Sequence, residues 1–207
     1  MRIKKISLVV AIMMVLAFII SSIMAFGADS NDAEAYFPLK PGNTWIYQLT
    51  LSGSSKTIQQ KIKVSDPEDG NPKLIVYDPN ANPQIFVYYV ENQQGLFKTK
   101  EMGPSGILQY KPLWQVLGAK INIGASWSWE SEDHKMKETA KVTAAEKVTV
   151  PAGAFETILI EYSGISQNNT AYTDKTWYAK GVGYVKDELT MDGKTLTSQL
   201  SEYQLAK

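Results

Sequence analysis

The chain offers few of the side chains that carry catalysis or bind metals. It contains one histidine, His134, and no cysteine among its 207 residues. Zinc and most transition metals are bound through those two residue types, so we expect no metal site and no cofactor. His134 lies between Asp133 and Lys135 in a charged segment, and no G-x-S-x-G motif accompanies it. The sequence therefore predicts no catalytic histidine and no serine hydrolase.

Paired carboxylates are the remaining catalytic option. Glycoside hydrolysis requires two acids that face each other across a cleft. The acids on expected strands that could serve are Glu130, Glu132, Glu161 and Glu188. Solvated or ion-paired side chains are the simpler interpretation, because charged residues on strands usually face water. We therefore expect a protein that is not an enzyme, with a hydrolase using strand carboxylates as an alternative.

Aromatic side chains are the more informative group, with five tryptophans and eleven tyrosines. Such rings can bind sugars or lipids, but they more often form the core of a β protein, because their burial dominates its stability. Trp114 lies in a segment broken by proline and glycine, which favours a role in a pocket or a lid. The candidate ligand-binding residues are Trp45, Tyr47, Trp114, Trp127, Trp129 and Trp177.

Turn residues between Val148 and Leu189 predict the elements that must position these rings. Pro151 to Gly153 joins two runs rich in β-branched and aromatic residues, and Asn168 with Asn169 marks the next reversal. Gly181 to Gly183 marks a further turn or bulge. No proline occurs after Pro151, so every later amide can donate to a sheet ladder.

The rest of the chain repeats this pattern of short alternating runs. Trp45, Tyr47 and Leu49 lie on one face of an expected strand, and the other face carries Ile46 and then polar residues, which is typical of a half-buried strand. We expect an all-β protein with about ten strands in one curved antiparallel sheet, a half-barrel or open barrel, since a flat sheet of that size would leave exposed edges. The segment Gly103–Ala119 is irregular and apolar, and we expect it to cover the open side of the sheet as a lid. A short helix over Leu113–Ala119 is an option there.

Two short segments are similar to each other. Gly42 to Tyr47 and Gly124 to Trp129 both read Gly-x-x-Trp-x-aromatic and both begin an expected strand. We predict that Gly42, Gly124, Gly153 and Gly183 lie at turns or bulges, at least two of them with positive φ. The echo suggests two similar half-sheets.

Three motifs carry a resemblance to a known group of proteins. They are FPLKPGNTWIY near Phe37, VPAGAFET near Pro151 and WYAKGVGYVK near Trp177. Together they resemble a family of exported bacterial proteins of unknown function, over essentially Tyr36 to Tyr203. The resemblance implies a curved antiparallel sheet similar to the half-barrel of periplasmic lipoprotein carriers. It implies no catalytic residues.

The N-terminus predicts export. Basic residues at positions 2, 4 and 5 precede 23 uncharged residues, Ile6–Ala28, with a small-residue cleavage site before Ala28. We expect residues 1–28 to be a signal peptide, or an uncleaved membrane anchor through residues 6–28. Residues 29–35 read as a linker and 36–207 as a single β domain. The expected location is secreted or in the cell envelope.

Charge excludes one class of partner. The whole chain has 21 basic and 21 acidic residues, and loss of the three N-terminal basic residues leaves a net charge of about −3. A nucleic-acid-binding protein would present a strongly basic face, so we expect no nucleic-acid partner.

Three functions follow from these observations. The leading hypothesis is a non-catalytic cell-envelope domain that binds an apolar ligand or lipid on a concave sheet face. The second is a structural or protein-interaction module with a filled core, whose partner would be a cell-envelope protein. The third is the carboxylate hydrolase.

Overall fold

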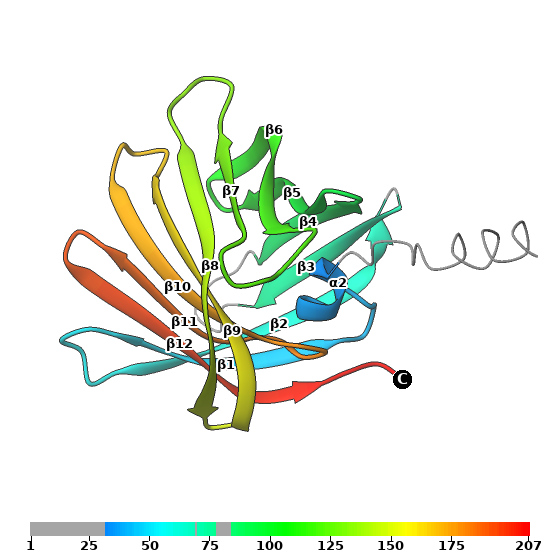
Figure 1. Ribbon diagram of the computed structural model, residues 1–207, viewed down its shortest axis with the longest axis vertical. Helices are drawn as coiled ribbons and strands as arrows, with labels where there is room; N and C mark the ends of the chain where they lie inside the picture. Colours follow the sequence, from blue (N-terminus) through cyan, green and yellow to red (C-terminus); the bar gives the residue numbers. More distant parts are fainter. Residues whose placement is uncertain (1–31, 69, 78–83) are drawn as a thin grey trace, which may run out of the picture. The chain divides into compact units, whose positions relative to one another are not determined.

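A computed structural model describes residues 32–68, 70–77 and 84–207, and these belong to one compact unit (Figure 1). The signal segment and the cleavage site lie outside the described residues. In the described part, twelve strands form one antiparallel sheet. The strands are β1 (Thr44–Leu51), β2 (Thr57–Glu68), β3 (Asn71–Tyr77), β4 (Ile85–Asn92), β5 (Gly95–Gly103), β6 (Gly106–Gly118), β7 (Ser126–Glu130), β8 (Lys137–Val150), β9 (Gly153–Ile165), β10 (Ala171–Ala179), β11 (Gly183–Met191) and β12 (Lys194–Gln204).

The sheet is a meander that curls until its two edges almost meet. Its order is β6-β5-β4-β3-β2-β1-β12-β11-β10-β9-β8-β7. The first and last strands, β1 and β12, therefore pair at the centre of the sheet, and the edge strands β6 and β7 are consecutive in sequence. These edges lie beside each other across a seam that has no backbone ladder (Figure 1). The all-β prediction of a curved antiparallel sheet is confirmed, and the sheet is a nearly closed barrel.

The barrel is built from the alternation that the sequence displays. In β8, buried and exposed residues alternate over Lys137–Val142, and the apolar positions pack into the core. Bulges and irregularities interrupt the alternation at the β5–β6, β8–β9 and β10–β11 pairs, where one strand gains residues relative to its partner. Bulges increase the local twist and bend, which helps a long sheet to close.

The segment predicted to be a lid is instead part of the wall. Residues 106–118 form β6, which pairs with β5 from Gly103↔Gly106 to Gly95↔Gly118. The helix considered over Leu113–Ala119 is not formed, because these residues complete the β5 ladder. The prolines and glycines that suggested a loop lie at the hairpin turn and along an edge strand, where proline is tolerated.

A short helix closes one end of the barrel in place of the predicted lid. It is α2 (Ala33–Tyr36), which includes residues that the sequence analysis treated as a linker. The Asp32 amide donates to the Ala119 carbonyl, and the Gly181 amide donates to the Ala35 carbonyl. Phe37 follows the helix and packs against Trp45, Tyr89 and Tyr184. No helix in the part of the chain that the structure describes is long and apolar enough to cross a membrane.

The two similar sequence segments occupy equivalent places. The Gly42 amide donates to the Val64 carbonyl, and the Gly124 amide donates to the Val142 carbonyl, which joins β1 to β2 and β7 to β8 in the same way. Gly42, Gly124, Gly153 and Gly183 all have positive φ, so the turn prediction is confirmed. The barrel therefore consists of two six-strand halves that begin alike.

Candidate functional site

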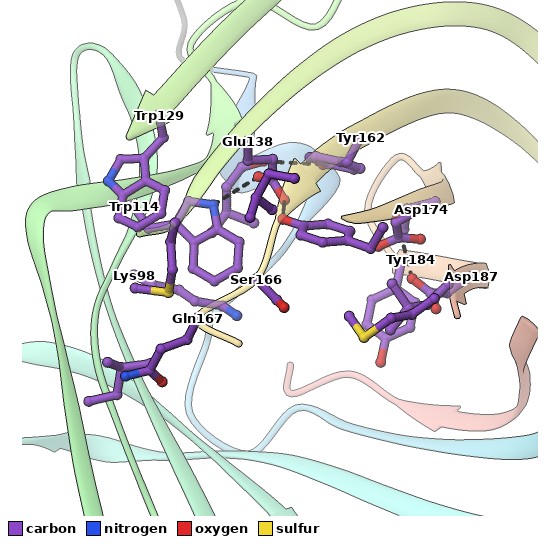
Figure 2. A pocket seen from close by; sticks show the side chains of 18 of the residues that line it. Lys98, Trp114, Trp129, Glu138, Tyr162, Ser166, Gln167, Asp174, Tyr184 and Asp187 are labelled. Atoms are coloured by element: carbon purple, nitrogen blue, oxygen red, sulfur yellow. Dashed lines mark hydrogen bonds between the residues drawn. The ribbon is translucent and has the colours of Figure 1, made fainter. Parts of the chain in front are cut away.

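The inner face of the barrel encloses a cavity of about 500 Å³ (Figure 2). Strands from both halves contribute to its wall, and Phe37 reaches it from the α2 end. Most lining side chains are aromatic or aliphatic, with a few charged groups among them. The lining residues are Phe37, Tyr89, Lys98, Leu108, Trp114, Val116, Trp129, Met136, Glu138, Tyr162, Ile165, Ser166, Gln167, Tyr172, Asp174, Thr176, Tyr178, Tyr184, Asp187, Leu189 and Met191.

Tryptophans close the seam and form one wall of the cavity. The Trp129 indole on β7 donates to the Pro112 carbonyl on β6 over 2.9 Å, and the Trp127 indole donates to the Gln115 carbonyl over 3.2 Å. Trp129 also stacks on Trp114 with ring centroids 5.3 Å apart. Side chains thus join two edges that the backbone ladder leaves unpaired.

Glu138 on β8 is the most buried acid of the site. Its carboxylate accepts hydrogen bonds from the Trp114 indole over 2.8 Å and from the Tyr172 hydroxyl over 2.7 Å. Burial raises the pKa of Glu138, and the two donors oppose that rise because they favour the charged form. The donors hold the carboxylate in place on the cavity wall.

Lys98 on β5 brings a positive charge to the same wall, but that charge has a partner. Its Nζ lies 2.8 Å from Glu101 and 4.5 Å from the centre of the Trp114 ring. Burial disfavours the charged form of Lys98, but the Glu101 carboxylate outweighs this and the pKa of the lysine is raised. Lys98 and Glu101 therefore form an internal ion pair.

Asp174 on β10 and Asp187 on β11 form a carboxyl pair on another part of the wall (Figure 2). The two side chains hydrogen-bond to each other, and the Thr176 hydroxyl lies 3.4 Å from Asp187. Burial and the neighbouring negative charge raise the pKa of Asp174 to about 8, and burial raises the pKa of Asp187 to about 6. Two carboxyls this close share a proton, because both cannot ionise cheaply.

Tyrosine rings surround the carboxyl pair. Tyr178 and Tyr184 pack edge to face with centroids 6.4 Å apart, and Tyr184 stacks on Tyr47 at 4.4 Å. The Tyr162 hydroxyl lies 3.5 Å from that of Tyr178 and donates to the Val116 carbonyl across the seam. The rings leave an aromatic chamber with acid groups exposed to its interior.

The structure separates the six predicted aromatic residues into four groups. Trp114 and Trp129 line the cavity. Trp45 and Tyr47 lie one layer behind it, covered by the lining rings of Phe37 and Tyr184, and Trp127 packs at the seam beside Gly118 and Tyr162.

Trp177 does not belong to the concave face on which it was predicted. Its neighbours Thr176 and Tyr178 line the cavity, and Trp177 instead meets Glu146 and Lys186 on the outer face. The β8–β9 hairpin reaches over that face, where the Ala152 amide donates to the Leu200 carbonyl. The outer face is therefore also buried around Trp177, and burial alone does not identify the inner face.

The polar residues of the cavity were missed by sequence reasoning, although two had a signal. Glu138 shares the alternating face of Ala140 and Val142, and Asp174 lies between Tyr172 and Tyr178 on one face. The acids that were singled out lie elsewhere. Glu161 pairs with Lys175 and Glu188 with Lys186, while Glu130 meets His134 and Glu132 is exposed.

The chemistry available to the site is that of an aromatic chamber with acid groups. Among the described residues, no group of three or more histidine, cysteine, aspartate or glutamate side chains is placed to hold a metal ion. A carboxyl pair can hold one proton, donate a hydrogen bond or attract a cation. These properties suit the binding of a small molecule that is apolar over most of its surface.

The fold is a nearly closed antiparallel barrel with a cavity on its inner face. Residues 129–201 match the DUF3108-like family. The comparison with curated proteins gives no match.

Solved structures with a similar chain path come from several bacteria. A candidate lipoprotein of Parabacteroides distasonis is 15% identical, with 82% of this chain and 98% of that chain covered and a TM-score of 0.44. A candidate exported protein of Bacteroides fragilis with a YmcC-like fold is 12% identical, with 82% and 99% covered and a TM-score of 0.44. The MucA/MucB complex of Pseudomonas aeruginosa contains a chain that is 13% identical, with 84% and 54% covered and a TM-score of 0.41.

Proposed function

We propose that the protein is a non-catalytic exported domain of the cell envelope that binds a small, largely apolar ligand inside its barrel. The observation that supports this most directly is the cavity of about 500 Å³ on the inner face of the sheet. Ligand sites typically occupy about 300–1,000 Å³ and combine apolar walls with a few placed polar groups. The lining here has that composition.

The barrel could have filled this space with side chains, as most protein interiors do. Large rings such as Trp114 and Tyr172 instead stand around the space, held by hydrogen bonds to Glu138. Polar anchoring fixes the rings at the wall and opposes their collapse into the centre. A wall held open in this way favours a ligand chamber over the alternative of a structural module with a filled core.

The proposed cellular location of the protein rests on the N-terminal segment. A basic start, a long uncharged stretch and a small-residue cleavage site are typical of export. Chains of similar path include one described as a candidate exported protein. We therefore place the domain outside the cytoplasm, as secreted or envelope-bound.

The ligand claim is tested by filling the cavity. Leu189 lines the space, so Leu189→Trp should occupy part of it and weaken binding of the neutral fluorescent probe N-phenyl-1-naphthylamine at least about tenfold. The matched control is Ile123→Trp, because Ile123 is 63% exposed and lies outside the cavity. Native mass spectrometry of the purified protein would show a co-purifying ligand directly. Equal probe binding by both variants, with no co-purifying species, would favour the structural module.

The carboxyl pair supports the hydrolase as a second candidate, with different residues from those predicted. Asp174 and Asp187 share a proton, as the acids of aspartic proteases do. A hydrolase would turn over chromogenic glycosides or peptides and would lose that turnover in Asp174→Asn. A pure binding protein would show no turnover with either form.

A further inference from the structure

The charged groups of the cavity do not balance. Of the described residues that line it, Lys98 is the only basic one, and its charge is matched by Glu101 at 2.8 Å. Glu138 and the Asp174–Asp187 pair are then left without a basic side chain to offset their negative charge. Their hydrogen-bond donors are hydroxyl and indole groups, which are neutral. The chamber is therefore net negative in its interior.

Asp174 also has an unused acceptor. Its Oδ1 is buried and makes no hydrogen bond to any residue in the described part of the chain. A buried carboxyl oxygen without a partner is costly, and a buried polar atom of this kind calls for an explanation. A ligand that donates a hydrogen bond or carries a positive charge would satisfy it.

The rings around the pair suit a cation. Tyr178 lies within electrostatic range of both carboxyls, and Tyr184, which packs against it, lies within range of Asp187. A cation over an aromatic face gains energy from the ring quadrupole, and more so when water is excluded. The cavity already shows this contact once, where the Lys98 ammonium lies 4.5 Å from the Trp114 ring.

We propose that the cavity binds an amphiphilic ammonium ion, whose charged head lies at Asp174 and Asp187 and whose apolar tail extends along the Trp114–Trp129 wall. This inference rests on the proposed function, since it names the chemical class of the ligand for that chamber. The tail would contact residues such as Leu108, Met136 and Ile165. Both simple amines and quaternary amines fit this description.

The same charge pattern argues against the anionic lipids that a lipid carrier would suggest. A fatty-acid carboxylate or a phosphate headgroup would face three carboxyl groups, while the one lysine is already paired. Like charges at close range in a partly buried site are unfavourable. The cavity should therefore distinguish ligands of equal length by their charge alone.

Three probes with one tail test the proposal: octylammonium, octanol and octanoate. Each is titrated at neutral pH into the protein purified as the cell produces it, without detergent, by tryptophan fluorescence and calorimetry. We expect octylammonium to bind at least about tenfold more tightly than octanol, and octanoate more weakly than octanol. In Asp174→Asn/Asp187→Asn the ratio of octylammonium affinity to octanol affinity should fall to about twofold or less.

Octanol serves as the internal control for an intact cavity, and Glu161→Gln is the matched control for the loss of a strand acid. Glu161 pairs with Lys175, away from the cavity lining, so this variant should keep the full preference. Equal binding of octanol and octylammonium by the unaltered protein would overturn the ammonium inference and leave the proposed function standing. Absence of binding by all three probes would overturn both. A double variant that binds octanol but keeps the ammonium preference would show that the head lies elsewhere and would overturn the site assigned here.

Discussion

Replacement of Asp174 by asparagine should stabilise the protein without ligand, and the gain should grow as the pH rises. The pKa of Asp174 is raised from 3.8 to about 8, so the native state keeps a proton that the unfolded chain releases. A group with this behaviour lowers stability as the pH rises from about 4 through the raised pKa. Asparagine imitates the protonated acid, because its amide can still donate to Asp187.

The size of the effect follows from the same values. About three pH units separate the ordinary pKa of 3.8 from pH 7, and each unit corresponds to about 1.4 kcal/mol, which gives an upper limit of about 4 kcal/mol. Asp187 shares the proton, which reduces the cost. We expect a measured gain of about 2 kcal/mol at pH 7 and close to none at pH 4.

Urea unfolding at several pH values measures this difference directly. Asp66→Asn is the matched control, because Asp66 is exposed on β2 and lies outside the cavity lining. The control should change stability by less than about 0.5 kcal/mol at every pH. A destabilised Asp174→Asn, or a gain of the same size at pH 4 and pH 7, would refute the view that Asp174 is a buried, proton-sharing acid.

Three further predictions concern the seam, a turn and the N-terminus. Trp127→Phe/Trp129→Phe removes two indole donors to β6 and should cost about 1–3 kcal/mol, with faster hydrogen exchange in β6 but not in β1; unchanged exchange in β6 would mean that the seam is held by other contacts. Gly183→Val should cost about 1–2 kcal/mol or more, because Gly183 has φ +111° and a Cβ there would lie 3.4 Å from the Trp45 indole nitrogen. The control Gly193→Asn, at φ +69° in open space, should change little; equal thermal stability of the two variants would contradict the strain argument. N-terminal sequencing of protein from its native host should begin near Ala28, and a start at Met1 would contradict cleavage.

The sequence was enough for the class of fold and for the turns. Alternating runs, turn prolines and glycines such as Gly153 are local signals, because strand period and backbone conformation depend on a few neighbouring residues. The same signals misled at Gly103–Ala119, where prolines and glycines suggested an irregular lid and the residues form β6. Pairing with β5 decided that segment, and the local residue pattern does not show whether a segment finds a strand to pair with.

The site was decided mainly by the tertiary structure. Asp174 follows the alternation of Tyr172 and Tyr178 and could have been assigned to the inner face. Asp187 could not have been assigned to the inner face from the sequence. Strict alternation would place its side chain on the other face of β11 from Tyr184, which lies three residues earlier. The bulge between β10 and β11, where Trp177 pairs with Lys186 but Tyr178 pairs with Tyr184, shifts the parity and turns both Tyr184 and Asp187 inward. One extra residue in a strand exchanges its two faces, so the carboxyl pair exists only because two strands pair in this register.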